Sequence, residues 1–275
     1  MEIIKSTGEK EVFQKDKFCL SVERAGAPRD LLENVCSIVE KELKPDIRTT
    51  EIFRTASRYL LKENLAVGMR YNLRRGIMEL GPAGFRFEQF IEALMKTLGY
   101  ETRRDVIVEG QCVSHEVDVV AIKDDRHYLM EMKYHNSWGV KTGIETTMYA
   151  YARLLDIAPR EERRERYSKI HALWLVTNAK FTSKAIEYGT CQKLTMTGWD
   201  YPKDGNSLEL LIRSTKTYPV TVLPSVDRFV LEAFARYNMI LAQDVLPYTE
   251  ERLVKEFALE ERKAAQILKE ARLLF

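Results

Sequence analysis

The stretch from His115 to Asn136, HEVDVVAIKDDRHYLMEMKYHN, places one acidic residue inside each of two apolar, strand-like runs. The runs flank the pair Asp124-Asp125, which predicts an antiparallel hairpin with its turn at these two residues. A turn centred there places Asp118 directly opposite Glu131, and an odd loop length would make them diagonal neighbours. Like charges in facing positions destabilise a sheet, so we expect a positive charge between these two acids.

Lys133 follows Glu131 by two positions, so strand alternation predicts that both side chains point to the same face. Two carboxylates and an ammonium group on one sheet face suit a hard divalent cation, Mg²⁺ or Mn²⁺, which binds through oxygen ligands. Such a cation lowers the pKa of a bound water and neutralises charge on a phosphate, while Lys133 orients the water or stabilises the transition state. The alternative is an ordinary hairpin with an Asp–Lys pair at its edge.

Composition limits the classes of function. The chain has 275 residues, 45% of them hydrophobic, and a formal charge of only +2, so overall charge alone does not hold nucleic acid. Nucleic-acid contacts must therefore be local, for example at Arg103 and Arg104. The run Pro159–Lys169 is another candidate, but its alternating signs favour a solvated helix end. We expect a soluble, cytoplasmic protein with no membrane segment, because no apolar run is long enough to span a bilayer. Four scattered cysteines indicate reduced, structural thiols rather than a zinc ribbon or disulfide framework: Cys19, Cys36, Cys112 and Cys191.

The pattern of helices and strands predicts a multidomain chain of α+β and α/β parts. Residues 1–80 indicate a β-hairpin plus helices, and Gly81, Pro82 and Gly84 mark a boundary. Residues 81–202 alternate helices and strands, which predicts an α/β core around a mixed sheet. Residues 203–275 are mostly helical, and FALEERKAAQILKEARLL weakly resembles the second half of a helix-hairpin-helix element without its usual glycine. For this last part we expect helical packing or oligomerisation.

Four motifs in the central part, in order FEQFIEALMKTLGYET, HEVDVVA, MEMKYHN and LVTNAKFTSKAIEYG, resemble the PD-(D/E)xK nucleases, and most closely the Mrr-type, type IV restriction endonuclease-like branch. The resemblance implies a metal-dependent endonuclease acting on DNA. Asp118 and Glu131 would be the metal ligands, Lys133 the catalytic lysine and Glu88 an accessory acid; the alternative for Glu88 is a solvated helix residue. Where several relatives carry Gln-x-x-x-Tyr, this chain has Glu145 and Tyr149, which puts a phosphate contact there in doubt.

The first 80 residues, through IIKSTGEKEVFQKDKF, IRTTEIF and AVGMRYNLRR, resemble the ATP-cone, the regulatory nucleotide-binding module of ribonucleotide reductases. The resemblance implies ATP or dATP as a regulatory ligand. Ser6 stands where a second basic residue is usual, which leaves the strength of triphosphate binding and the choice between ATP and dATP open, and the alternative is a cone-like bundle that binds no nucleotide. The implied nucleotide-binding residues are Ile4, Lys5, Glu11, Gln14, Lys17 and Thr49.

Together the two resemblances lead us to expect a Mg²⁺- or Mn²⁺-dependent DNA endonuclease that is regulated by adenine nucleotide, in which the cone sets the assembly state of a homo-oligomer. One alternative is a nucleotide-sensing, DNA-binding regulator without cleavage, although such a protein has no need of Asp118, Glu131 and Lys133 together. Another is a nuclease specific for RNA or for nucleic-acid structure, because the phosphate chemistry is common to these substrates.

Overall fold

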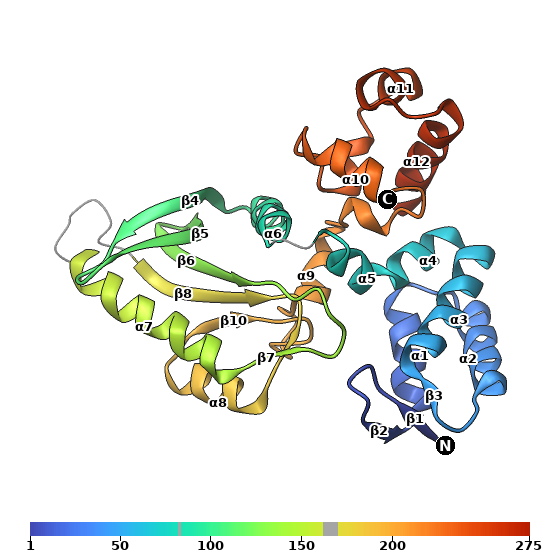
Figure 1. Ribbon diagram of the computed structural model, residues 1–275, viewed down its shortest axis with the longest axis horizontal. Helices are drawn as coiled ribbons and strands as arrows, with labels where there is room; N and C mark the ends of the chain where they lie inside the picture. The colour runs from blue at the N-terminus through green and yellow to red at the C-terminus, as the bar shows by residue number, and fades with distance from the viewer. Residues whose placement is uncertain (82–83, 162–169) are drawn as a thin grey trace. The chain divides into compact units, whose positions relative to one another are not determined.

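A computed structural model of the chain describes residues 1–81, 84–161 and 170–275 and divides into two compact units (Figure 1). Unit 1 combines Met1–Leu80 with Tyr218–Phe275, and unit 2 is Gly81–Thr217. The protein therefore has the expected multidomain α+β architecture. The segments before and after unit 2 fold together into unit 1. The predicted domains 1–80, 81–202 and 203–275 had placed these two segments in separate domains. In the described ranges, no helix is both long and apolar enough to cross a membrane.

Unit 2 is built on a five-stranded sheet with the strand order β10-β8-β6-β5-β4. Neighbours among β4, β5 and β6 run antiparallel, whereas β6, β8 and β10 run parallel, so the sheet is mixed as predicted. The strand bounds are β4 Glu101–Glu109, β5 Ser114–Lys123, β6 Arg126–Lys133, β8 Ile170–Thr177 and β10 Thr195–Thr197.

Helices of unit 2 pack on this sheet through apolar stripes. On α6, Phe87, Phe90 and Leu94 have no exposed surface, and the helix contacts β4 and β5. The helix α7 lies against β8 and α8, where Ala150 and Leu173 belong to one buried cluster. The remaining elements are a two-strand sheet and a last helix. The bounds are α6 Phe85–Thr97, β7 Lys141–Thr142, α7 Ile144–Glu161, β9 Lys180–Phe181, α8 Ser183–Cys191 and α9 Leu208–Thr215.

The β5–β6 hairpin has its turn where the sequence predicts it. Asp124 and Asp125 both have positive φ, 50° and 61°, which is the conformation of a two-residue hairpin turn. Val119 pairs with Met130 in the antiparallel register. Continuing that register by one residue brings Asp118 opposite Glu131, so the turn geometry alone fixes which acids meet.

In unit 1, β1 pairs with β2 as the predicted hairpin, and β3 pairs in parallel with the other edge of β1. The sequence did not predict β3, because two residues are too few to show a period. A core of Val22, Val35, Val39 and Leu60 joins the first three helices. The bounds are β1 Glu2–Ile4, β2 Lys10–Val12, α1 Lys15–Arg24, α2 Arg29–Glu42, β3 Ile47–Arg48, α3 Thr49–Glu63, α4 Leu65–Tyr71 and α5 Leu73–Met78.

The last 58 residues of the chain, Tyr218–Phe275, complete unit 1 by packing on α4 and α5. Thr221 Oγ1 donates to the Gly76 carbonyl oxygen at 2.6 Å. A Cβ on Gly76 would lie 2.8 Å from Val222 Cγ1, so glycine is needed for this close approach. The bounds are η1 Val220–Val222, α10 Arg228–Ala235, η2 Ala242–Val245, α11 Glu250–Phe257 and α12 Glu261–Leu274.

Two further expectations are corrected or qualified by the structure. Cys19 and Cys36 form a disulfide between α1 and α2, so the expectation of four reduced cysteines is wrong. The pairing arises because the two helices bring the Cα atoms within 5.9 Å, which sequence spacing does not reveal. Cys112 and Cys191 are free and exposed. The two units divide between Leu80 and Gly81. Pro82 and most of the run Pro159–Lys169 lie outside the described residues.

Candidate active site and nucleotide pocket

Asp118 and Glu131 lie side by side on β5 and β6, and a protein donor holds one oxygen of each carboxyl. Asp118 Oδ2 accepts from the Met132 backbone N–H at 2.6 Å. Glu131 Oε2 accepts from Arg153 Nη1. Within the described part of the chain, Asp118 Oδ1 and Glu131 Oε1 accept no hydrogen bond. The two carboxyls are therefore fixed in orientation, and each keeps one oxygen for a ligand.

Burial and mutual repulsion make the two acids costly to ionise. Burial, and then the neighbouring Asp118 charge, raise the pKa of Glu131 to about 7, and Arg153 and Lys133 only partly oppose this. Burial also raises the pKa of Asp118, against the lowering effects of the Met132 N–H and Arg153. Additional positive charge is thus favourable at this place, as the sequence indicated.

Arg153 on α7 is the residue of this site that the sequence analysis missed. Its side chain is buried, with only 8% of the residue exposed, and Nη2 donates to the Glu116 carbonyl oxygen. Its Nε atom is buried and has no hydrogen-bond partner among the residues that the structure describes. The signal was present in the sequence, because Arg153 follows Glu145 and Tyr149 at steps of four on one helix, and its guanidinium lies 5.7 Å from the Tyr149 ring centre.

Lys133 ends β6 with an exposed side chain that forms no ion pair with any residue that the structure describes. Its backbone carbonyl accepts from Thr177 Oγ1 at 2.7 Å, which fixes the strand end. His135 lies two residues after Lys133. Its backbone N–H donates to Asn178 Oδ1 at 2.8 Å, and its carbonyl oxygen accepts from Asn178 Nδ2 at 2.7 Å. The His135 ring forms a hydrogen bond with the Thr142 hydroxyl. Burial and the nearby Lys133 charge lower the pKa of His135.

Glu88, the predicted accessory acid, lies in the first turn of α6 and is half-buried. Burial, Asp118 and Asp105 raise its pKa, so Glu88 lies close enough to Asp118 to be affected by its charge. The structure does not assemble it into a metal site, since no group of three His, Cys, Asp or Glu side chains close enough to hold an ion occurs in residues 1–81, 84–161 and 170–275. Glu145, in the place of the usual glutamine, is exposed.

A divalent cation nevertheless fits Asp118 and Glu131. Mg²⁺ keeps several waters and binds proteins through one or two carboxylates together with substrate phosphate, so a third protein acid is not required. Two fixed carboxyls, each with an unused oxygen, provide this donor set.

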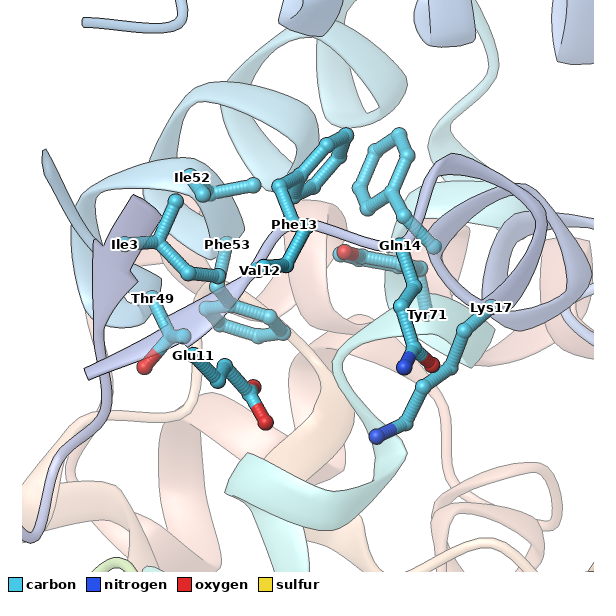
Figure 2. A pocket seen from close by; sticks show the side chains of 11 residues that line it. Ile3, Glu11, Val12, Phe13, Gln14, Lys17, Thr49, Ile52, Phe53 and Tyr71 are labelled. Atoms are coloured by element: carbon cyan, nitrogen blue, oxygen red, sulfur yellow. The ribbon is translucent and has the colours of Figure 1, made fainter. Parts of the chain in front are cut away.

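A second candidate site is a cavity of about 180 Å³ in unit 1, drawn in Figure 2. Glu11 and Thr49 lie on one side of it, and Gln14 and Lys17 lie on the other. The structure thus brings together four of the six residues that were predicted to bind nucleotide.

The other two predicted residues, Ile4 and Lys5, do not line this cavity. Ile3 does, because it faces Glu11 on the neighbouring strand and alternation turns Ile4 to the opposite face. Lys5 lies near the cavity through its ion pair with Glu11, at 3.1 Å.

Apolar residues make up much of the cavity lining, and the sequence does not predict a role for them there. The rings of Phe53 and Tyr71 stack with centroids 5.2 Å apart. Burial raises the pKa of Tyr71 to about 12, so its hydroxyl stays neutral. The only hint in the sequence was the number of aromatic residues in this segment, which also suits an ordinary core. The apolar lining consists of Ile3, Val12, Phe13, Phe18, Ile52, Phe53 and Tyr71.

Comparison with known proteins identifies relatives of both the C-terminal part and the larger part of the chain. Residues 218–275 match the family model described as AF1548-like, C-terminal, and this match begins where the second part of unit 1 begins. An uncharacterized protein of Archaeoglobus fulgidus is 38% identical over 180 residues, which cover 65% of this chain and 96% of the relative. The chain belongs to the AF1548-like family.

A solved structure supports the same relationship. The crystal structure of AF1548, a protein of unknown function, is 35% identical and aligns with a TM-score of 0.57, covering 69% of this chain and 97% of that chain. Neither the Archaeoglobus fulgidus protein nor the AF1548 structure has a stated activity, and about a third of this chain lies outside each match. Any assignment of chemistry therefore depends on the sites themselves.

Proposed function

We propose that this AF1548-like protein is a nuclease that hydrolyses phosphodiester bonds of DNA with the help of Mg²⁺ or Mn²⁺. The observation that carries the proposal is the pair Asp118 and Glu131, facing each other on β5 and β6 with Lys133 at the end of the same strand as Glu131. The mixed sheet with α6 beside it is the setting that the sequence resemblance to PD-(D/E)xK nucleases implies.

Each residue has a separate role in the proposed reaction. Asp118 and Glu131 would hold the cation, which lowers the pKa of a bound water and neutralises charge on the phosphate. Lys133, with its ammonium group exposed and unpaired by any described residue, can donate to a phosphate oxygen or orient the attacking water. Burial and the nearby Asp118 charge raise the pKa of Glu88, which suits an accessory acid that can donate a hydrogen bond to a water.

The cavity in unit 1 supports a regulatory role for an adenine nucleotide, ATP or dATP. Its apolar and aromatic lining suits a base, Glu11 and Thr49 can hydrogen-bond the base or ribose, and Lys17 supplies a positive charge for phosphate. A regulatory ligand must bind two states of the protein with different affinity, and we propose that these states differ in the assembly of identical chains.

The decisive experiment is a cleavage assay on supercoiled plasmid, linear DNA and RNA, with Mg²⁺, Mn²⁺ or EDTA and with or without ATP and dATP. Wild type should cleave DNA only with the cation, and Asp118→Asn and Lys133→Ala should not cleave. Glu187→Gln and Lys184→Ala, at exposed positions of α8, are the matched controls and should retain activity.

Other outcomes separate the alternatives. DNA binding without cleavage under all these conditions would favour a nucleotide-sensing regulator. Cleavage of RNA alone, or of branched DNA alone, would favour a nuclease of different substrate class. Full activity in both Asp118→Asn and Lys133→Ala would reject the proposed active site.

A further inference from the structure

We propose that Arg153 is a positioning residue, which holds the Glu131 carboxylate in the orientation that binds the cation. This inference rests on the proposed function, because it assigns a role in the same cation site. The guanidinium contacts Glu131 and the Glu116 carbonyl at once, so it joins α7 to both strands that carry the acid pair.

The burial of Arg153 indicates that this contact is specific. Arginine is rarely buried unless it is paired, and Arg153 is 8% exposed. Arg153 Nη1 and Nη2 are directed at different strands, an arrangement that matches the planar fork of a guanidinium and that the single ammonium of lysine does not reproduce. The side chain therefore does more than supply a charge.

The contact leaves the binding oxygens available. Arg153 takes Oε2 of Glu131, as the Met132 N–H takes Oδ2 of Asp118, so each carboxyl is fixed by one oxygen and keeps the other. A partner in this position sets the rotamer of a metal ligand without competing for the oxygen that binds. Removing such partners typically weakens metal binding by about 10- to 100-fold.

The test measures Mn²⁺ binding by calorimetric titration of the full chain with MnCl₂, together with thermal melting in EDTA. Arg153→Met should weaken Mn²⁺ binding by about 10- to 100-fold. Arg153→Lys should weaken it less, because an ammonium group can still donate a hydrogen bond to Glu131. In the double variant Glu131→Gln/Arg153→Met, binding should be no weaker than in Glu131→Gln alone, since the arginine acts through Glu131.

Arg213 provides the control for a purely structural effect. It forms an ion pair with Glu209 within α9, at 2.9 Å, with both side chains largely buried. Arg213→Met should lower the melting temperature and leave Mn²⁺ affinity unchanged. If Arg153→Met does not fold, the comparison of Arg153→Lys with Arg213→Lys gives the same test.

Two negative outcomes have different meanings. If Arg153→Met or Arg153→Lys binds Mn²⁺ as tightly as wild type, or more tightly, the guanidinium does not position the ligand and the inference is wrong, while the nuclease proposal stands. If Glu131→Gln and Asp118→Asn also bind Mn²⁺ like wild type, the cation site itself is wrong, and both proposals fail.

Discussion

A carboxyl placed beside another carboxyl inside a sheet costs free energy unless a cation joins them, and Asp118 is such a group. In EDTA at pH 8, Asp118→Asn should raise the free energy of unfolding by about 1 kcal/mol, because it removes a like charge from a facing position. The pKa of Asp118 is raised in the folded protein. Ionisation of Asp118 therefore destabilises the folded protein at high pH and not at low pH. The difference in the free energy of unfolding between the variant and wild type should shrink toward pH 4.

Urea unfolding of wild type and Asp118→Asn at pH 8 and pH 4 checks this prediction, with Glu187→Gln as the control that should show no such trend. Added Mn²⁺ should stabilise wild type and not the variant, because a ligand stabilises only the state that binds it. A variant that is less stable than wild type at pH 8 in EDTA would show that the two acids do not repel each other.

In the proposed nuclease, Lys133 would act in the reaction and would not contribute to the stability of the fold. Lys133→Ala should abolish cleavage but change the free energy of unfolding by less than about 0.5 kcal/mol, because exposed substitutions away from special features have small effects. Its Mn²⁺ affinity should stay equal to that of wild type or rise slightly, since a nearby positive charge is removed. The test measures plasmid cleavage, urea unfolding and Mn²⁺ titration on the same preparations, with Lys184→Ala as the control. Loss of folding in Lys133→Ala would contradict the prediction.

At this scale the sequence predicted the part of the site that depends on short-range rules. The Asp-Asp turn and strand alternation are enough to bring Asp118, Glu131 and Lys133 together. Arg153 comes from α7, and its contact with Glu131 depends on how that helix crosses the sheet, which no local pattern contains. Ile4 does not line the cavity, because its side chain lies on the opposite face of β1 from Ile3.

Among the elements, the loop between β4 and β5 is tied to α7 by one carboxylate. Asp156 accepts from the backbone N–H groups of Cys112 and Val113, at 2.8 and 3.3 Å, and bonds His115 Nε2 at 2.7 Å. These contacts hold the pKa of Asp156 well below its usual range, and the hydrogen bond with His115 has the largest effect. The carboxylate thus stabilises the folded protein at pH values above the ordinary aspartate pKa. This stabilisation is lost as the pH falls below that value.

Asp156→Asn should therefore lower the melting temperature at pH 7, and the difference from wild type should narrow below about pH 4, where an unfolded aspartate is protonated. Thermal melting across this pH range, beside Glu187→Gln, gives the comparison. Equal melting temperatures at pH 7 would mean that the loop is not held by this residue.

The elements that the sequence predicted best are those with long apolar stripes or alternation, such as α6 and the β5–β6 hairpin. The two-residue strands β3, β7 and β9 were not predicted, because pairing with a distant partner, and not local preference, makes them strands. The Cys19–Cys36 disulfide was missed for a related reason, since it depends on the packing of α1 against α2.

On the scale of the whole molecule, the proposal joins nucleotide binding to assembly. ATP or dATP should change the mass of wild type seen by mass photometry. Lys17→Ala should weaken nucleotide binding by at least about tenfold, because a charge-assisted hydrogen bond is worth about 1.5–3 kcal/mol. Lys5→Ala should weaken it less, since Lys17 lines the cavity and Lys5 pairs with Glu11 beside it.

Calorimetric titration with ATP and dATP measures the affinities, and the mass of Lys17→Ala should then respond only at higher nucleotide concentration. Nucleotide binding in wild type without a change in mass or in cleavage rate would reject the regulatory proposal and leave the cavity as a binding site alone.

Unit 1 takes its residues from both ends of the chain, and this has a consequence for the order of events during translation. The α12 helix packs on α4, and η1 packs on α5. The Thr221–Gly76 bond and the close approach of Val222 to Gly76 lie in the contact of η1 with α5. A ribosome releases residues from the N-terminus onward, and domains generally fold as units once their residues are available. All of unit 2 therefore emerges while unit 1 still lacks its last helices. In a nascent chain the proposed nuclease can fold before the module that would regulate it is complete.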